Sequence, residues 1–443
     1  MAEPFTREPT FTPSGARDRT AYFAAAYALL GERGADGVTI AALCERLNVT
    51  KGSFYHHFTD MPGFLEAFAL HWKSWLYERI ADFEAIGDPA RRLEKIANSL
   101  DLVSGSQAAI RAWAGTNPVL AATFQDVHQP WNALLARTIG QIVGDPELGL
   151  VLQALALAIG VGIELRAQPL DGERFLRVEQ EISRRCFALE FELVRIHDRP
   201  VLELRGPASL RPHAVEAPHP LPAGLKWAEA DPWPHAGEVV PGQRIRGREA
   251  WFAAAREILA GSGSDALTVD ALCRRLSVTK GSFNWHFENM PQFLQAFAEH
   301  WEHTHDRLLA GYREEPDPMT RLARLQRQML AAPDQAETAI RAWAHTEPVI
   351  GHALRRIDRR KQDLNTATIH AATGDPDAEL LAEMMLSLAI GLREAEHPRV
   401  EPDLAARIVM KWATNFLRLD AELHEEDGKP VITLNIPADR SRN

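Results

Sequence analysis

The chain has 443 residues, too many for one ordinary hydrophobic core, and roughly two to four domains are expected at about 150 residues each. Hydrophobic residues make up 46% and charged residues 25%, which is typical of globular proteins and excludes a disulfide scaffold or general disorder. The formal charge of -11 argues against attraction of the whole surface to nucleic acid or lipid, but a local basic patch could still dock on phosphates.

The N-terminal stretch and the cysteines favour a cytoplasmic protein. Residues 1–15 are polar and contain prolines, without the apolar run of a secretory signal, so we expect a flexible extension. The cysteines are odd in number and widely spaced, which predicts neither a disulfide framework nor a zinc cluster and fits a reducing compartment. They are Cys44, Cys186 and Cys273.

The longest apolar segment runs from Leu150 to Leu165. It is shorter than the roughly 20 residues that span a bilayer, and it contains Gln153 and Glu164. We therefore expect a helix buried in a bundle and no membrane partner.

The chain consists of two similar halves. The segment "RDRTAYFAAAYALLGERGADGVTIAALCERLNVTKGSFYHHF" from Arg17 matches "RGREAWFAAAREILAGSGSDALTVDALCRRLSVTKGSFNWHF" from Arg246 without a gap. Further on, "AIRAWAGTNPVL" from Ala109 pairs with "AIRAWAHTEPVI" from Ala339, and "LALAIG" pairs with "LSLAIG". Each half ends in two extended runs around a polar turn, which predicts a closing β-hairpin. A repeat of this length indicates a duplicated unit.

The coarse pattern of each half is helical, so the fold class predicted is all-α. Apolar residues recur at helical spacing over 23–30 and 252–259. The "NVT" and "SVT" stretches predict a tight turn before a short helix, and Asn48 accepts a left-handed backbone more readily than Ser277. Thr50 and Thr279 are placed to cap that helix with their hydroxyls. The result is a three-helix head with a helix-turn-helix.

The segment from Thr39 through "VTKGSFYHHF" to an amphipathic helix resembles the TetR/AcrR transcriptional regulators. The resemblance continues into "IRAWAHTEPVIGHALRRIDRRK" from Ile340. Members of that family usually pair as homodimers, whereas this chain carries both partners. The resemblance implies a regulator, most often a repressor, in which a small molecule entering the body shifts the helix that connects body and head.

We expect two heads, two bodies and a linker. Residues 16–60 form head one and 61–205 body one; residues 243–289 form head two and 290–437 body two. The proline-rich stretch 206–242 is the linker, and 438–443 is a tail. The last two apolar helices of each half would form a four-helix seam within one chain, with the linked partner at high effective concentration. Further association of two chains stays open.

The short helix of each head is predicted to enter the major groove. Thr-Lys-Gly-Ser at its start offers hydroxyls, an ammonium and close-approaching backbone to phosphates and base edges, and short basic arms precede each head. The candidate DNA-binding residues are Arg17, Arg19, Thr39, Thr50, Lys51, Gly52, Ser53, Tyr55, His56, His57, Arg244, Arg246, Arg248, Thr268, Thr279, Lys280, Gly281, Ser282, Asn284, Trp285 and His286.

The heads differ where Tyr55 and His56 are replaced by Asn284 and Trp285. In the family the position of Tyr55 commonly contacts phosphate, while Asn can pair with adenine and Trp offers bulk and one donor. This predicts an asymmetric operator with unlike half-sites, although Trp285 could instead pack against the head. His57, like its counterpart His286, either contacts a phosphate, as the resemblance implies, or only caps its helix.

The bodies contain candidate ligand-pocket residues whose alternative role is packing. They are Trp72, Trp75, Trp113, His128, Trp131, Trp301, Trp343, His352 and Asp358. The matching segments around His128 and Asp358 differ, so the two bodies could take different ligands or one could be silent. The ligand itself is not identified by the sequence.

Two other classes of function were weighed. A metal site at His300, His303 and His305 is disfavoured, because the first half has His71, Ser74 and Leu76 there, and no cofactor is predicted. No nucleophile with an adjacent base and no phosphate loop is present, so we expect no enzyme. The alternative to a regulator is a ligand-binding or protein-docking scaffold whose heads have lost DNA affinity.

Overall fold

The computed structural model describes residues 18–99, 110, 113–114, 117–166, 170–196, 199–207, 247–330, 334–393, 400–426 and 429–435. The chain divides into two compact units. Unit 1 comprises Met1–Gln153 and Asp171–Leu210, and unit 2 comprises Ala154–Leu170 and Arg211–Asn443. The predicted N-terminal extension, the tail and nearly all of the linker lie outside the described residues.

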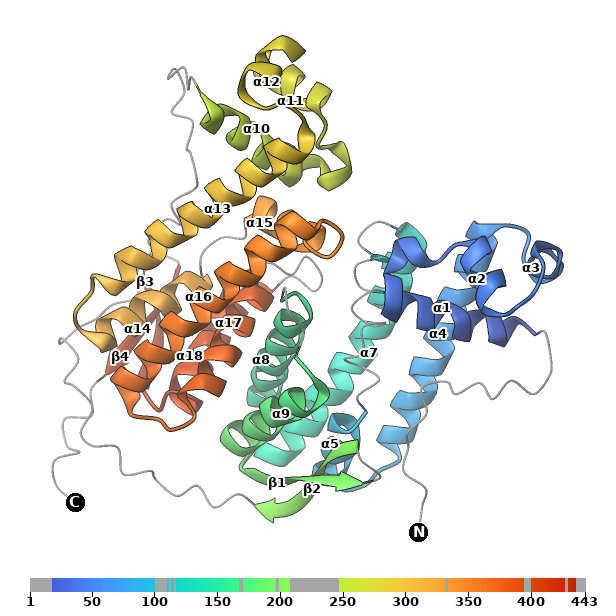
Figure 1. Ribbon diagram of the computed structural model, residues 1–443. Coiled ribbons are helices and arrows are strands. Elements are labelled where there is room, and N and C mark those ends of the chain that lie inside the picture. The colour runs from blue at the N-terminus through green and yellow to red at the C-terminus, as the bar shows by residue number, and fades with distance from the viewer. Residues whose placement is uncertain are drawn as a thin grey trace. The chain divides into compact units, whose positions relative to one another are not determined.

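Unit 1 is helical apart from one hairpin (Figure 1). Its helices are α1 (Arg19–Arg33), the 3-10 turn Ala35–Gly37, α2 (Ile40–Arg46), α3 (Lys51–His57), α4 (Met61–Glu84), α5 (Pro89–Ala97), α7 (Pro118–Val143), the first part of α8 (Pro146–Glu164) and α9 (Gly172–Phe187). Strands β1 (Leu189–Ile196) and β2 (Arg199–Pro207) pair antiparallel. The long helix α4 leads from the head helices α1–α3 to the body (Figure 1).

Unit 2 repeats this order, with α13 leading from its head to its body (Figure 1). Its elements are α10 (Arg248–Ser262), the 3-10 turn Ser264–Ala266, α11 (Val269–Leu276), α12 (Lys280–His286), α13 (Met290–Arg313), α14 (Pro318–Arg327), the 3-10 turn Gln328–Leu330, α15 (Gln335–Trp343), α16 (Pro348–Thr373), α17 (Ala378–Arg393), α18 (Pro402–Asn415), β3 (Asp420–Glu426) and β4 (Lys429–Asn435). The all-α class and the hairpin that closes each half are confirmed.

Local signals set the helix boundaries in both heads. The turn before α3 has Asn48 at φ 51°, and the turn before α12 has Ser277 at φ 56°, so both residues adopt the left-handed backbone that the turn requires. The side chains of Asp60 and Asn289 accept hydrogen bonds from Gly63 N (2.8 Å) and Gln292 N (2.9 Å), which caps α4 and α13 as predicted.

The capping role predicted for Thr50 and Thr279 is wrong. Both residues occupy the N-cap position, but neither hydroxyl accepts a bond from the helix. The first turn of α3 is closed instead by the backbone, because Ser53 N donates to Thr50 O at 3.0 Å. The hydroxyls are thus left available to an outside partner.

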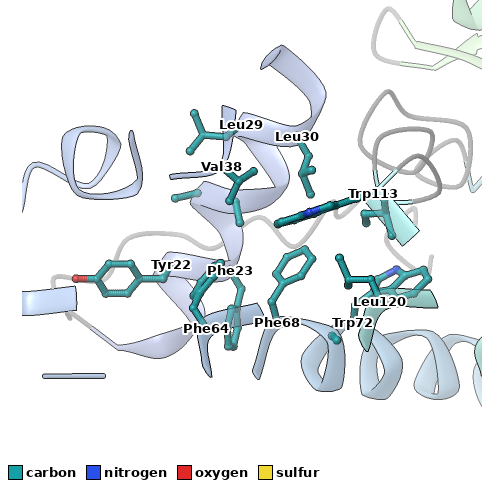
Figure 2. Packing of buried hydrophobic residues seen from close by; sticks show 14 of the residues in the cluster. Tyr22, Phe23, Leu29, Leu30, Val38, Phe64, Phe68, Trp72, Trp113 and Leu120 are labelled. Atoms are coloured by element: carbon teal, nitrogen blue, oxygen red, sulfur yellow. The ribbon is translucent and has the colours of Figure 1, made fainter. Parts of the chain in front are cut away.

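Each head is held by a cluster of aromatic rings, which Figure 2 shows for unit 1. Phe54 and Phe58 of the short helix are buried against Tyr22 of α1, with ring centroids 5.7 and 5.6 Å apart in edge-to-face geometry. Cys44 is buried beside them. These residues therefore belong to the core, as predicted, and fix the orientation of the short helix.

Within unit 2, the second part of α8 crosses α17 at very close range. A Cβ at Gly162 would overlap the backbone of Ser387, and one at Gly391 would overlap that of Ala158. Small residues at a crossing let two helix backbones approach closely, as in membrane helix pairs. The two contacts lie in the matching segments that contain "LALAIG" and "LSLAIG". The crossing therefore joins equivalent helices of the two halves, although nothing lies within 4 Å of a Cβ built at Gly160, the equivalent of Gly391.

A buried ion pair flanks this crossing. Arg166 Nη1 donates to Glu383 Oε1 at 3.2 Å, and Arg166 Nη2 donates to Gln362 Oε1 at 2.8 Å. Helix α8 is long and apolar enough to cross a membrane by composition, but 61% of the apolar window is buried inside the protein. The expectation that it is too short is therefore wrong by length, while its role as a packed helix agrees with its burial.

Candidate nucleic-acid interface

The short helices α3 and α12 present one buried and one exposed face. On α3 the exposed side chains are Lys51, Tyr55 and His56, and Tyr55 is 54% exposed. On α12 they include Asn284 and Trp285, and Trp285 is 85% exposed. The packing alternative for Trp285 is wrong, since a side chain this exposed contributes little to the core of the head.

An arginine side chain donates hydrogen bonds to the C-terminal end of each short helix. Arg19 Nε and Nη2 donate to the carbonyl of His57 at 3.2 and 2.8 Å, and its guanidinium lies 5.3 Å from the centre of the Phe58 ring. Arg248 Nη2 donates to the carbonyl of His286 at 2.9 Å. These bonds satisfy a free carbonyl and orient the short helix, a structural role that the sequence did not reveal.

The glycines at the start of the short helices have room around them. The nearest neighbour of a Cβ built at Gly52 is Thr50 Oγ1 at 3.5 Å, and at Gly281 it is Thr279 Oγ1 at 3.6 Å. Neither residue has a positive φ. Packing inside the protein therefore does not require glycine at either position.

The two heads differ in how the hydroxyls at this surface are held. Thr39 and Thr268 cap α2 and α11 by accepting from Ala42 N and Ala271 N, both at 3.1 Å. Ser53 accepts a bond of 3.0 Å from the phenol of Tyr22. In head two Trp251 stands in place of Tyr22 and makes no such bond with Ser282.

The heads also differ in charge. Lys280 Nζ lies 2.7 Å from Asp270 Oδ1, and both side chains are exposed. The position of Asp270 is Ala41 in head one, so Lys51 has no such carboxylate beside it. Asp270 is not among the predicted residues, although the two halves already differ at this position in the sequence. Head two therefore offers phosphates a partly neutralised cation.

Three of the predicted basic-arm residues cannot be placed on this surface. Arg17, Arg244 and Arg246 lie outside the described residues. Arg19 and Arg248 are exposed at the first turn of α1 and α10. His57 and His286 are half-buried against Tyr22 and Trp251, with ring centroids 5.6 and 6.1 Å apart.

The structure divides the candidate pocket residues of body one between two clusters. Trp72 and Trp113 are buried in the cluster that extends from the head, and Trp75 packs on it (Figure 2). Trp131 belongs to a separate cluster, where its ring lies 5.9 Å from Phe83. His128 stays with the first group, since its ring centroid is 3.9 Å from that of Phe124.

The pocket prediction for His352 is wrong. Its side chain is exposed on α16, whereas Trp301 and Asp358 are buried. Trp343 packs at the edge of the head-two cluster. Helical periodicity alone could have separated His352 from Asp358, because positions six residues apart lie on different sides of a helix.

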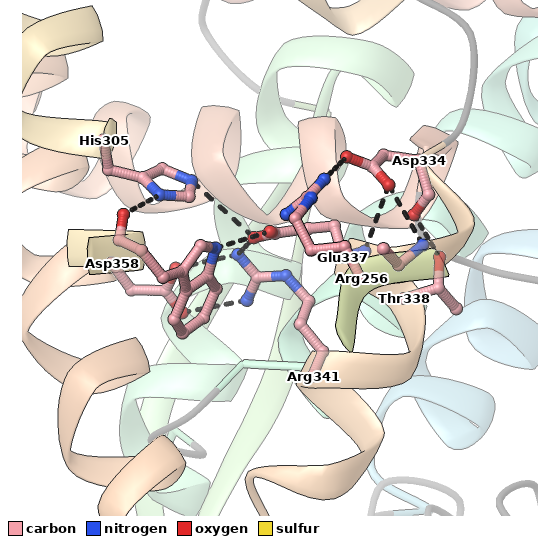
Figure 3. Close-up of polar contacts among 9 residues, drawn as sticks. Arg256, His305, Asp334, Glu337, Thr338, Arg341 and Asp358 are labelled. Atoms are coloured by element: carbon pink, nitrogen blue, oxygen red, sulfur yellow. Dashed lines mark hydrogen bonds and ion pairs between the residues drawn. The ribbon is translucent and has the colours of Figure 1, made fainter. Parts of the chain in front are cut away.

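Asp358 and Trp301 take part in a buried polar network, shown in Figure 3. Arg341 donates to both oxygens of Asp358, at 3.1 and 2.9 Å. Trp301 Nε1 donates to Glu337 Oε2 at 3.1 Å. Arg256 of α10 pairs with Asp334, the N-cap of α15, at 2.5 Å. The partly buried pair of Arg256 and Asp334 connects the first helix of head two to the body.

Burial and neighbouring charges set the protonation of this network. Burial lowers the pKa of His305 to about 4, so its imidazole is neutral at pH 7. Burial alone would raise the pKa of the Glu337 carboxyl, but His305, Lys361 and Arg341 outweigh it and lower that pKa. Arg341 likewise outweighs the burial of Asp358 and keeps its pKa below the ordinary value.

The three histidines considered as a metal site point to different surroundings. His300 stacks on Phe252 at 4.7 Å, His303 is exposed, and His305 is buried with Nδ1 3.1 Å from the carbonyl of Trp301. Across the described ranges no group of three or more metal-ligating side chains converges.

Known proteins match the two heads. A family described as bacterial regulatory proteins of the tetR family matches residues 23–68 and 252–297. The HTH-type transcriptional regulator BetI of Burkholderia lata is 32% identical over 107 residues. That match covers 23% of this chain and 50% of the relative, so the chain spans half the length of the relative.

Two solved structures resemble part of the chain. A transcriptional regulator from Pseudomonas aeruginosa PAO1 has a TM-score of 0.32 at 19% identity, over 39% of this chain and 90% of that one. A transcriptional regulator from Rhodococcus sp. Rha1 has a TM-score of 0.31 at 20% identity, over 39% and 96%. Both heads of the chain therefore match the helix-turn-helix domain of the tetR family, which supports a tandem regulator of that kind.

Proposed function

We propose that this DNA-binding regulator is a cytoplasmic, ligand-responsive repressor that binds an asymmetric operator as a single-chain pseudo-dimer. The observation that carries the proposal is the pair of heads with the same scaffold and different exposed residues, Tyr55 and His56 against Asn284 and Trp285. Two heads with different exposed residues require two half-sites of different sequence, about one helical turn apart on the duplex.

The helix crossing supports the pseudo-dimer. Gly162 and Gly391 bring α8 of the first half and α17 of the second half together at close range. The two helices are equivalent in the repeat, and a contact between equivalent elements is expected where two similar halves pair. The domain limits that we propose are 16–60 and 243–289 for the heads and 61–205 and 290–437 for the bodies.

The residues proposed to contact DNA fall into two classes. Lys51, Lys280 and the hydroxyls of Thr50 and Thr279 would position the heads on phosphates, while the exposed pairs Tyr55–His56 and Asn284–Trp285 would read bases or their backbone. The candidates held in internal bonds, such as Arg19 and Thr39, would act mainly by orienting the short helices.

Repression and ligand response would work through the connecting helices. A ligand bound in a body changes the separation of the heads only if it binds the DNA-competent and incompetent states with different affinity. Helices α4 and α13 join head and body in their respective units and are the elements that would transmit the change.

Footprinting on the DNA that flanks its own gene tests the function, combined with selection of binding sites from random duplexes. The expected result is protection of two adjacent half-sites of different sequence, with affinity that falls steeply as salt rises. A perfect palindrome would overturn the asymmetric operator. Absence of binding to any fragment at low salt would favour a scaffold with degenerate heads.

A further inference from the structure

The buried polar network of body two is held by internal hydrogen bonds and ion pairs. Trp301 donates to Glu337, and Arg341 binds Asp358 while lying 3.7 Å from Glu337 (Figure 3). Arg256 is paired with Asp334. Carboxylates thus accept from the buried indole and from both terminal nitrogens of the buried guanidinium.

The first half carries different chemistry at the repeat-equivalent positions. Arg256, Trp301, Glu337, Arg341 and Asp358 correspond in sequence to Tyr27, Trp72, Gln107, Arg111 and His128. The first half has neither carboxylate. It keeps the tryptophan whose indole donates to Glu337 in the second half, and the arginine that pairs with Asp358 there. Gln107 and Arg111 lie outside the described residues, so for these two the comparison is one of sequence alone.

Two buried donors of the first half have no partner among the described residues. Trp72 is 1% exposed and its Nε1 makes no hydrogen bond, although the equivalent Trp301 bonds to Glu337. The hydroxyl of Tyr27, in the place of Arg256, is buried and makes none either. Each such group costs about 1–3 kcal/mol, so proteins rarely leave one unsatisfied without a ligand or water for it.

The surroundings of these donors are flat and aromatic. The ring of Phe124 stacks on Trp72 at 6.0 Å with an interplanar angle of 22°, and His128 lies 3.9 Å beyond it. Phe68 lies 4.9 Å from Tyr27 and packs in the same cluster as Trp72 (Figure 2). These aromatic surroundings suit a planar apolar body, and the indole and the phenol suit a hydrogen-bond acceptor.

We propose that the first half binds a small aromatic carboxylate at Trp72 and Tyr27, and that Glu337 and Asp358 take the place of that carboxylate in the second half, which binds none. The protein thus has one effector site per chain. This inference rests on the proposed ligand response and names the class of effector and the half that senses it.

Calorimetric titration of the full chain without DNA tests the site, with benzoate, phenylacetate and 3-phenylpropanoate as probes. Their neutral amides serve as isosteric controls. We expect one carboxylate per chain and at least tenfold weaker binding of the amides, because the charged acceptor is lost. No binding of any carboxylate, equal binding of acids and amides, or two sites per chain would overturn the proposal.

Trp72→Phe keeps an aromatic ring and removes the donor, so it should weaken carboxylate binding about tenfold. Trp301→Phe is the matched variant in the second half and should leave binding unchanged. Tyr27→Phe, the smaller change, keeps the test decisive if Trp72→Phe unfolds, which circular dichroism shows. Equal effects of Trp72→Phe and Trp301→Phe would contradict the assignment to the first half.

The doubly substituted variant Glu337→Gln with Asp358→His gives the second half the residues of the first at these two positions, while Arg256 remains in the place of Tyr27 as a cationic donor. The expected result is a second carboxylate site, raising the stoichiometry from one to two. A stoichiometry that stays at one in a folded variant would refute the replacement of ligand by internal carboxylate. DNA binding is measured separately, so loss of the regulator function and loss of this site are distinguishable.

Discussion

Single residues decide how strongly each head can hold a phosphate. Lys51 stands beside Ala41, whereas Lys280 is paired with Asp270 at 2.7 Å. An exposed pair of this kind adds little stability, but it places a negative charge on the surface that we propose to face the duplex. The internal comparison of two heads therefore separates recognition from stability within one molecule.

Lys51→Ala should lower DNA affinity and reduce the slope of log affinity against log salt by about one, as expected for one lost phosphate contact. Lys280→Ala should reduce the slope less, because its charge is already partly neutralised. Electrophoretic shifts over a salt series measure both. Identical losses for the two variants would contradict the unequal roles of the lysines.

Asp270→Ala copies head one and should strengthen DNA binding, since it removes a carboxylate near the phosphates and frees Lys280. The free energy of unfolding of the variant should lie within about 0.5 kcal/mol of that of the parent, because only an exposed pair is broken. Weaker DNA binding would show instead that Asp270 itself accepts a bond from a base.

Gly52→Ala should fold normally, because its methyl would lie 3.5 Å from Thr50 Oγ1 and has no other neighbour within 4 Å. It should nevertheless weaken DNA binding, because the added methyl stands between the helix and the duplex. Thermal unfolding and a binding curve provide the two measurements. An unchanged binding curve would mean that this face does not approach DNA.

At the scale of elements, the second half joins head to body through polar contacts as well as apolar packing. Arg256 of α10 bonds to the N-cap of α15 in a partly buried pair, and His305 of α13 lies 3.8 Å from Glu337 of α15. Removing one partner of a fully buried ion pair costs about 3–5 kcal/mol, because the other charge stays buried. A substitution at Arg256 or Asp334 should therefore destabilise unit 2, by less than that figure because the pair is partly exposed.

The neutral state of His305 makes the stability of unit 2 depend on pH. Its pKa is about 4 in the folded protein and about 6.5 when unfolded, so the unfolded chain binds the proton more readily between these values. The contribution of His305 to the free energy of unfolding is fully present above pH 6.5. It is lost as the pH falls toward 4, and the loss is roughly 3 kcal/mol at most.

His305→Leu, which copies Leu76 of the first half, should remove that dependence on pH. Urea unfolding at pH 7 and pH 5 measures it, with His303→Leu as a control because His303 is exposed on the same helix. A pH dependence that persists in His305→Leu would place the titrating group elsewhere.

At the scale of the whole molecule, the proposed pseudo-dimer would replace association of two chains by duplication within one. A homodimer depends on protein concentration, whereas two linked halves would meet at an effective concentration near the millimolar range. Linkage also allows the halves to diverge, since a change in one head is no longer copied into the other. The differences at Asn284, Trp285 and Asp270 are of this kind.

Gly162→Ala should destabilise the protein by about 1–3 kcal/mol and lower DNA affinity, because its methyl overlaps the backbone of Ser387. Gly160→Ala is the matched control on the same helix: nothing lies within 4 Å of its Cβ, and alanine favours the helix. Thermal unfolding and operator binding are the readouts. Similar behaviour of the two variants would argue against the close crossing.

The sequence by itself determined the duplicated plan, the helical class, the heads and the hairpins, because each rests on local patterns: apolar periodicity, capping residues and a turn that needs a left-handed backbone. Even so, Thr50 and Thr279 show the limit of such rules, since they hold the cap position without the capping bond.

Only the tertiary structure decided which polar groups meet. Glu337 and Asp358 belong to different helices, and their convergence on Trp301 and Arg341 depends on how α13, α15 and α16 pack. The same holds for Arg19, whose partner His57 lies 38 positions away. Contacts between distant residues follow from packing in three dimensions, which no local pattern of one sequence encodes.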